Sequence, residues 1–325
     1  MTTSIPTPPN AAWPEPRAVS LQLLLVQVLN GLQLGVLLFL VSAGLTVVFG
    51  VMGFINLAHG VQYMLGAYVA TALAAATGSF WAGLLLALPA TLAMGLALEW
   101  LIFRHLTARD HMDQVLATFG VILAVNEGVR MLFGPVPLAA AVPNALSGGV
   151  ALMPGLLYPA YRLALLGAGL LTAVLLWLVV ERTRAGMRVR AGASDAPMLA
   201  ALGVDTGRLF AGVFAVGAML AGFAGALAAP IFSVEPGMGD TVLILAFVVI
   251  IIGGVGSIRG AFIAALLVGL TDTLGKSLAP DLLRMVLDPS AARQAGAALA
   301  LMLVYLVMAV ILAVRPAGLF PVRAS

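Results

Sequence analysis

Residues 21–50 contain no charged side chain over thirty consecutive positions, which is longer than the roughly 20 apolar residues that a helix needs to cross a bilayer. They form either one tilted helix or a helix followed by a second, shorter piece. Similar apolar runs recur along the chain, so that 62% of its residues are hydrophobic and 9% are charged. Soluble domains have about 45–50% and about 25%. So little polar surface could not cover a water-soluble globule, and the sequence predicts an all-α polytopic membrane protein.

The apolar runs number nine, or ten if the first one divides, which gives an expectation of about eight to ten transmembrane helices. The shortest run, residues 241–252, is too short to be assigned a full crossing. Residues 134–159 hold five prolines and residues 276–293 are polar, so both are expected to form external loops. A single transmembrane permease domain is predicted over residues 21–325.

The first twenty residues differ from the rest of the chain. They contain five prolines and no long apolar run, which is typical of a disordered tail and does not fit a cleavable signal peptide. The first apolar run is therefore expected to act as an uncleaved insertion signal. The sequence contains no cysteine, which excludes disulfides and thiolate chemistry.

Two Gly-rich breaks, residues 51–60 and 253–260, lie between apolar runs, one in each half of the chain. Backbone that is not helical at membrane depth must be buried in protein or line a water-filled cavity. Transporters built from repeats place such broken helices at the substrate path, and the alternative is a pair of ordinary Gly-rich loops. The predicted pathway or gate residues are those of the two breaks: Asn56, His59, Gly60, Gly253, Gly254, Gly256 and Gly260.

One long polar stretch, residues 181–208, interrupts the apolar pattern and carries five arginines. Because cytoplasmic loops are enriched in Lys and Arg, this loop is expected to be cytoplasmic. Counting outward with every segment crossing, Arg104, Arg259 and Arg315 also fall inside, whereas Lys276, Arg284 and Arg293 fall outside as the one discordant loop. The side of the N-terminus stays open.

A short amphipathic helix is predicted inside this loop. Ser194 or Asp195 can cap it, Pro197 is tolerated in its first turn, and Gly203 can end it in the left-handed conformation. It is either a solvated helix of a basic loop or a helix that docks into a groove on a soluble partner. The residues expected to carry such docking are Arg188, Arg190, Asp195, Met198, Leu199, Leu202 and Gly203, with Met198, Leu199 and Leu202 on one apolar face.

Two pairs of opposite charges fall within apolar runs. Glu127 and Arg130 are three residues apart, and Asp272 and Lys276 are four apart, so each pair can meet on one helix face. Polar groups inside a membrane are functional candidates by default, but a structural pair is the preferred interpretation of Glu127 and Arg130. No metal-ligand set, nucleophile motif or phosphate-binding loop is present, so no cofactor is expected on this chain.

Four motifs resemble those of one family. INLAHG at residues 55–60, followed by YMLGAY at 63–68, resembles the opening signature of Liv-type permeases, the membrane subunits of ATP-binding-cassette importers for branched-chain and other apolar amino acids. Residues 183–205 resemble their cytoplasmic coupling loop, AFVVIIIGGVGSIRGA at 246–261 their second Gly-rich signature, and RPAGLF at 315–320 their closing motif. The pattern is most similar to the H subunit and runs over nearly the whole chain.

The resemblance implies a complex in the bacterial inner membrane. It would contain two permeases, the second being a different chain, two cytoplasmic ATPases that bind ATP and Mg²⁺, and a periplasmic solute-binding protein. The helix at residues 195–202 would insert into an ATPase groove. Val61 stands where the family often has an acidic residue, and Pro197 should shorten the coupling helix. Urea and short-amide permeases share much of this pattern, and a stand-alone channel or secondary transporter is the other alternative. No enzymatic activity and no nucleic-acid partner are expected.

Overall fold

The computed structural model describes residues 21–54, 56–107 and 109–320, and most of them are helical. The predicted disordered tail at residues 1–20 lies outside the described residues. The helices are α1 (Leu21–Met52), α2 (His59–Thr77), α3 (Phe80–Leu101), α4 (His111–Phe133), α5 (Ala160–Arg182), α6 (Arg184–Ser194), α7 (Ala196–Ala201), α8 (Thr206–Ala228), α9 (Met238–Gly253), α10 (Ile258–Leu283) and α11 (Pro289–Val314). Two 3₁₀ turns, Phe103–His105 and Asn144–Leu146, lie between them.

Seven helices of the described chain are long and apolar enough to cross a membrane: α1, α3, α4, α5, α8, α10 and α11. The nineteen-residue α2 is more polar, and the sixteen-residue α9 is shorter than a full span. The nine predicted apolar segments therefore all form helices, and residues 21–50 belong to one continuous helix. Residues 241–252 were expected to be too short for a full crossing, and they belong to the short helix α9. The protein is a multi-pass all-α membrane protein.

The structure agrees with one of the two loops expected on the external side and differs from the other. Residues 134–159 contain a short antiparallel hairpin, β1 (Gly149–Met153) paired with β2 (Leu156–Pro159). The prediction of a loop at residues 276–293 was wrong at both ends, because α10 continues to Leu283 and α11 already begins at Pro289. Asp288 ends this short connection and caps α11. Hydrogen bonds from the Ser290 hydroxyl and from the backbone N–H groups of Ala291 and Ser290 hold the pKa of the Asp288 carboxyl below its usual value.

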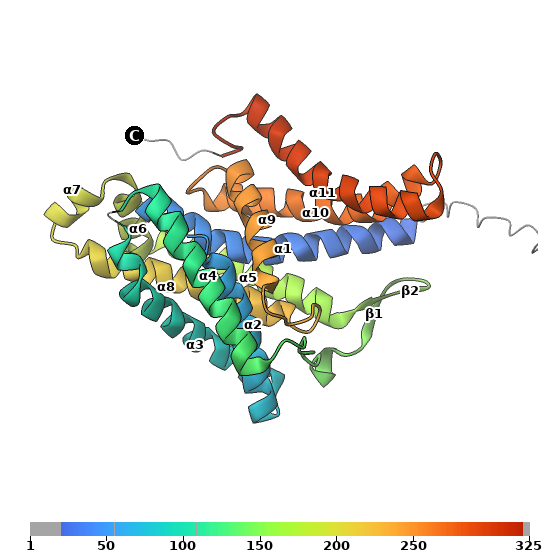
Figure 1. Cartoon of the computed structure of the whole chain (residues 1–325), viewed down its shortest axis with the longest axis horizontal. Coiled ribbons are helices and arrows are strands. Elements are labelled where there is room, and N and C mark those ends of the chain that lie inside the picture. Colours follow the sequence, from blue (N-terminus) through green and yellow to red (C-terminus); the bar gives the residue numbers. More distant parts are fainter. Residues whose placement is uncertain (1–20, 55, 108, 321–325) are drawn as a thin grey trace, which may run out of the picture.

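The long helices α1 and α10 lie side by side, as Figure 1 shows. Glycines allow this contact: a Cβ on Gly35 would lie 2.8 Å from the Cα of Leu266, and one on Gly31 would lie 3.0 Å from the Cα of Leu270. Small residues let membrane helices approach until their backbones touch. The same figure places α7 at one end of the molecule and the hairpin at the opposite end.

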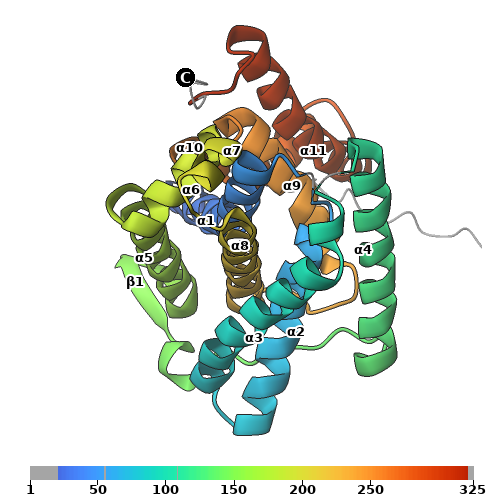
Figure 2. The same ribbon diagram turned by 90° about the vertical axis from the view of Figure 1, so that its left-hand side faces the viewer.

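Helix α8 occupies the centre of the molecule when it is viewed from the α7 end (Figure 2). The sequence predicted tight packing from its small residues, and this is confirmed. Gly222 lies against Gly66 of α2, and a Cβ on Gly44 of α1 would lie 2.6 Å from the carbonyl oxygen of Gly217. In contrast, α4, α5 and α11 lie at the periphery, and few of their residues are buried.

Both predicted charge pairs form. Arg130 Nη1 lies 3.7 Å from Glu127 Oε2, and both side chains are more than half exposed on α4. Lys276 Nζ lies 2.7 Å from Asp272 Oδ2, and only 3% of the Asp272 side chain is exposed. The second pair therefore contains a buried charge, whereas the first lies on the surface.

Candidate translocation and coupling site

The first Gly-rich break folds back into the interior. Helix α1 ends at Met52, and α2 begins at His59, whose Nε2 lies 3.1 Å from the backbone oxygen of Val41. Val41 precedes the end of α1 by eleven residues, which corresponds to about 16 Å of helix. The connection therefore returns along α1, and α2 starts deep in the molecule rather than at its surface.

Three polar side chains are buried in the protein interior at this point. Asn56, His59 and Gln62 are at most 3% exposed. Because a carbonyl only accepts, His59 Nε2 donates to Val41 and Nδ1 is left as an acceptor. Nδ1, both amide atoms of Asn56 and both amide atoms of Gln62 have no hydrogen-bond partner among the described residues. Buried polar atoms normally have a partner, so this cluster has unused capacity for a polar solute or water.

Gln62 was not singled out from the sequence. It lies three residues after His59, which places both side chains on one face of α2. That spacing was the available signal.

The second break lies at the far end of α9 from this cluster. The first turn of α9 touches the start of α2, since a Cβ on Gly60 would collide with the carbonyl oxygen of Gly239. At its last turn, a Cβ on Gly253 would lie 2.5 Å from the carbonyl carbon of Gly260. The predicted gate residues thus form two groups, at opposite ends of α9.

The C-terminal segment closes the second break. The backbone N–H of Leu319 donates to Ile252 O at 2.8 Å, and that of Phe320 donates to Gly253 O at 3.0 Å. These bonds satisfy carbonyls that the end of a helix leaves without partners. Gly254 has a φ of 97° and lies against Gly318. The second Gly-rich signature and the closing motif, which are far apart in the sequence, therefore form one structural unit.

The polar stretch folds into two helices, α6 and α7. Thr183 Oγ1 accepts the Gly186 N–H at 3.1 Å to cap α6, and Asp195 Oδ1 accepts the Met198 N–H at 2.8 Å to cap α7. Gly203 follows α7 with a φ of 84°. The Asp195 cap and the left-handed glycine agree with the prediction. Helix α7 has only six residues, but Pro197 does not shorten its front, because the helix begins at Ala196 and holds Pro197 in its first turn.

The predicted apolar face of α7 divides in two. Leu199 is 6% exposed and packs inward beside Gly192, whereas Met198 is 58% exposed and Leu202 is 74% exposed. The expectation of one common face was therefore wrong, because Leu199 anchors the helix while the other two side chains project outward. Two large apolar side chains are thus exposed on and just after α7, the helix that lies at one end of the molecule (Figure 1).

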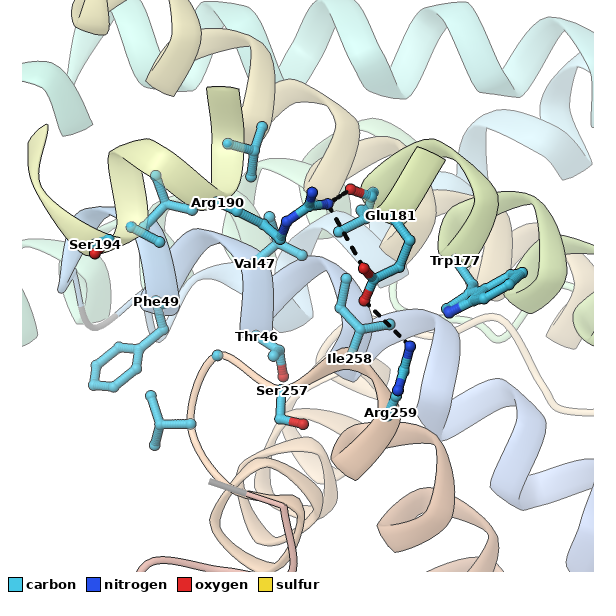
Figure 3. Close-up of a pocket in the computed structure, with 17 residues that line it drawn as sticks. Thr46, Val47, Phe49, Trp177, Glu181, Arg190, Ser194, Ser257, Ile258 and Arg259 are labelled. Carbon is cyan, nitrogen blue, oxygen red and sulfur yellow. Dashed lines mark hydrogen bonds and ion pairs between the residues drawn. The ribbon is translucent and has the colours of Figure 1, made fainter. Parts of the chain in front are cut away.

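The arginines of this segment also separate. Arg188 is exposed, but Arg190 turns away from α7 and donates to the backbone oxygen of Val180. Arg190 Nη1 lies 3.8 Å from Glu181 Oε2, and Arg259 Nη2, near the start of α10, lies 3.6 Å from Glu181 Oε1 (Figure 3). Glu181 thus connects α6 to the second Gly-rich break. The sequence indicated neither this carboxylate nor its two partners as a set.

A cavity of about 740 Å³ lies beneath α6, between the ends of α1, α5 and α10. A second cavity, of about 570 Å³, lies between α2, α3 and residues 139–145 and is lined mainly by alanines. Among the described residues, no group of three or more His, Asp or Glu side chains could hold a metal ion.

The fold and these sites define a multi-pass membrane subunit with a buried polar break and an exposed helical tip. A sequence model of the family described as "Branched-chain amino acid transport system / permease component" matches residues 27–312. The chain belongs to this family.

Curated relatives agree with this assignment. The chain is 30% identical to the high-affinity branched-chain amino acid transport system permease protein BraD of Pseudomonas aeruginosa, over 79% of this chain and 88% of BraD. It is 29% identical to the corresponding LivH of Escherichia coli K12, over 78% of this chain and 86% of LivH. It is 28% identical to a probable LivH of Methanocaldococcus jannaschii, over 73% and 76%. No solved structure matches the chain.

Proposed function

We propose that this protein is the permease subunit of an ATP-binding-cassette importer that moves branched-chain amino acids across the bacterial inner membrane. The observation that carries the proposal is the family match, which extends over residues 27–312 of a 325-residue chain. The named relatives are branched-chain amino acid permeases, and two of them are LivH proteins. The chain has no ATPase motif of its own, so ATP and Mg²⁺ would be bound by partner subunits.

The tip formed by α7 is the proposed contact with an ATPase. Exposed apolar side chains at a helix end favour insertion into a groove of a soluble partner, and Met198 and Leu202 are both exposed. The complete importer would contain two cytoplasmic ATPases, a second permease that is a different chain, and a periplasmic solute-binding protein. The lipid bilayer completes the surroundings of the subunit, and no nucleic acid is involved.

The solute path is proposed to run past the first break. Asn56, His59 and Gln62 offer unpartnered donors and acceptors in the interior, which suit a polar solute in transit. Binding of the ATPases at α7 would favour one membrane conformation over another. Through Glu181, movement of α6 would reach Arg259 and the second break.

Co-purification tests the docking role of α7. The complex is expressed with its neighbouring genes and solubilised, and ATPase subunits are pulled down with wild type, Met198→Glu and Leu202→Glu. Leu157→Glu is the matched control, because Leu157 is 72% exposed at the opposite end and Leu202 is 74% exposed. We expect ATPase retention by wild type and control, and at least tenfold loss in the two α7 variants. Equal retention in all four would contradict the docking role.

Uptake into proteoliposomes tests the solute. With ATPases and binding protein present, leucine, isoleucine and valine should accumulate only when ATP is supplied, and urea should not. Uptake of urea in preference to leucine would assign the chain to amide transport. Movement of solute by the purified chain alone, with no ATPase retained, would support a stand-alone channel or carrier instead.

A further inference from the structure

The cavity beneath α6 is built from four chain segments that meet at the α7 end of the molecule. Its walls come from the last turns of α1, the end of α5, α6, and the loop that leads into α10 (Figure 3). Its volume of about 740 Å³ lies in the range of about 300–1,000 Å³ that is common for small-molecule sites. None of its charged residues belongs to the interior polar cluster at the first break.

One carboxylate and two guanidinium groups line this cavity, and they form ion pairs with one another. Glu181 lies 3.6 Å from Arg259 and 3.8 Å from Arg190, both beyond ordinary hydrogen-bond length. Within the described residues, Arg190 donates to the backbone oxygen of Val180, and the Glu181 carboxylate meets Arg190 and Arg259 only at the longer ion-pair distances. A carboxylate and a guanidinium thus stand close together, each with capacity for a ligand group of opposite charge.

The ends of two helices add one negative and one positive position to the cavity. The last turn of α1, at Gly50 and Val51, lines the cavity, and the final carbonyls of a helix form its negative pole. The first turn of α10, at Ile258 and Arg259, lines the cavity as well. The start of a helix is its positive pole, and Ser257 accepts only the N–H groups of Gly260 and Ala261 there. A positive and a negative binding position therefore coexist in one cavity.

An unpartnered buried hydroxyl also belongs to this site. Thr46 lines the cavity, is 0% exposed, and its Oγ1 has no hydrogen-bond partner in the described chain. Thr91, Thr118 and Thr172 instead donate to the carbonyl four residues earlier in their helices. Thr46 therefore retains an unused donor and acceptor in the wall of the cavity, beneath its accessible surface.

The remaining wall is apolar. Trp177 lies at its edge. The valine and isoleucine side chains that contribute to it come from α1, α5, α6 and α10: Val47, Val180, Val189 and Ile258. We propose that the cavity is a binding site for an amino acid with a branched apolar side chain. Its α-carboxylate would bind Arg259 and the start of α10, and its α-ammonium would bind Glu181 and the end of α1.

This inference rests on the proposed function, which places an amino acid at this end of the molecule after transport. A lipid phosphate is the competing occupant, because Arg190 and Arg259 could attract one. Glu181 favours the amino acid, because it offers a partner for an ammonium group, which a phosphate lacks. A zwitterion satisfies both signs.

Trp177 provides a direct readout of binding. The complete transporter, without its solute-binding protein, is placed in nanodiscs, with the other three of the four tryptophans changed to phenylalanine. Leucine should shift the tryptophan emission in a saturable manner, and adding Trp177→Phe should abolish this shift, which separates Trp177 from any tryptophan of the partner subunits. Isovalerate lacks the ammonium group and isoamylamine lacks the carboxylate, so each should bind at least tenfold more weakly than leucine.

Substitutions assign the two poles. Glu181→Gln and Arg259→Gln should each weaken leucine binding at least tenfold, and Val47→Phe should do so by filling the cavity without changing a charge. Arg284→Gln is the matched control, because Arg284 also pairs with a carboxylate, Asp281, at 3.1 Å but lies outside the cavity. It should bind leucine as the unsubstituted protein does. Monodisperse elution on size-exclusion chromatography verifies that each variant is folded.

Three results would overturn the proposal. Trp177 emission could be insensitive to leucine, leucine binding could be unchanged in the three cavity variants, or emission could follow only the phosphatidylglycerol content of the nanodisc, which would assign the cavity to a lipid headgroup. ATP-driven leucine uptake, measured in the same preparation with binding protein added, separates failure of the cavity site from failure of the proposed function. Uptake without a Trp177 response overturns the cavity site alone, whereas absence of uptake overturns the proposed function and the site that rests on it.

Discussion

At the residue scale, Gly203 fixes how the chain leaves α7. Its φ of 84° lies in the left-handed region, and a Cβ added there would meet no atom within 4 Å. A substitution at this position is therefore opposed by backbone conformation and not by collision. Asparagine tolerates this conformation better than other residues, whereas β-branched residues tolerate it poorly.

Gly203→Val should consequently reduce coupling while the membrane domain remains folded. The strain of about 1–3 kcal/mol can be relieved locally by unwinding the six-residue α7. We expect a loss of ATPase retention and of ATP-driven uptake in Gly203→Val, and near wild-type values in Gly203→Asn. Uptake by Gly203→Val equal to that of wild type would count against a coupling role for this turn.

Lys276 compensates a buried charge at the opposite end of the molecule. Asp272 is 3% exposed, Lys276 is 53% exposed, and Asp272 Oδ1 has no hydrogen-bond partner. Removing the lysine leaves an uncompensated carboxylate, which costs several kcal/mol when both groups are buried. Because Lys276 is half exposed, we expect Lys276→Met to lower the free energy of unfolding by about 1–3 kcal/mol.

Thermal unfolding in detergent measures this effect. Arg284→Ala, which breaks a more exposed pair with Asp281, should cost about 0–1 kcal/mol. Changing Asp272→Leu together with Lys276→Met should restore most of the stability, since it removes both charges. A double variant no more stable than Lys276→Met would show that the ion pair is not the cause.

At the scale of helices, the contact between α2 and α8 depends on absent side chains. A Cβ on Gly225 would collide with the backbone oxygen of Tyr63, whereas a Cβ on Gly212 in the same helix would meet nothing within 4 Å. Gly225→Ala should therefore separate the two helices and destabilise the protein by about 1–3 kcal/mol. Gly212→Ala should stabilise it by up to about 1 kcal/mol, because alanine favours the helix.

Fluorescence-detected size-exclusion chromatography after heating compares the two glycine variants under one set of conditions. The expected order of apparent melting temperatures is Gly225→Ala below wild type, with Gly212→Ala at or above it. The reverse order would mean that general helix propensity, and not the close contact with α2, determines stability at these positions.

The same scale shows which elements could be predicted. Apolar runs identified the spanning helices, and Asp195 with Gly203 identified α7, because these signals are local. Helix α6 was missed, since its arginines gave no apolar face, although Thr183 caps it. The end of α10 was also missed, because polar residues beyond Asp272 continue the helix. The depth of the first break depends on the contact of His59 with Val41, and no local pattern reports it.

The candidate sites were likewise predicted only where the signal is local in the sequence. Asn56, His59 and the glycines of both breaks stood out as polar or flexible residues between apolar runs. Their separation into two groups along α9 follows from the contacts of Gly60 with Gly239 and of Gly253 with Gly260. The Glu181 pairs with Arg190 and Arg259 join the end of α5 to α6 and to the start of α10. Only the three-dimensional structure could bring these charges together.

For the whole molecule, the arrangement of the two ends makes a prediction about orientation. The α7 tip and the β1–β2 hairpin lie at opposite ends of the molecule (Figure 1). The five arginines between residues 181 and 208 favour a cytoplasmic position for the first end. The hairpin should then face the periplasm, where a solute-binding protein would deliver its ligand.

Cysteine labelling measures this orientation directly, because the natural sequence contains no cysteine and every label reports the introduced one. Leu157 is 72% exposed on β2, and Ser194 is exposed at the end of α6. A membrane-impermeant maleimide small enough to pass the outer membrane should label Leu157→Cys in intact cells. It should label Ser194→Cys only after the inner membrane is permeabilised. Labelling of Ser194→Cys in intact cells would place α7 outside, where no ATPase could reach it, and would contradict both the orientation and the coupling role.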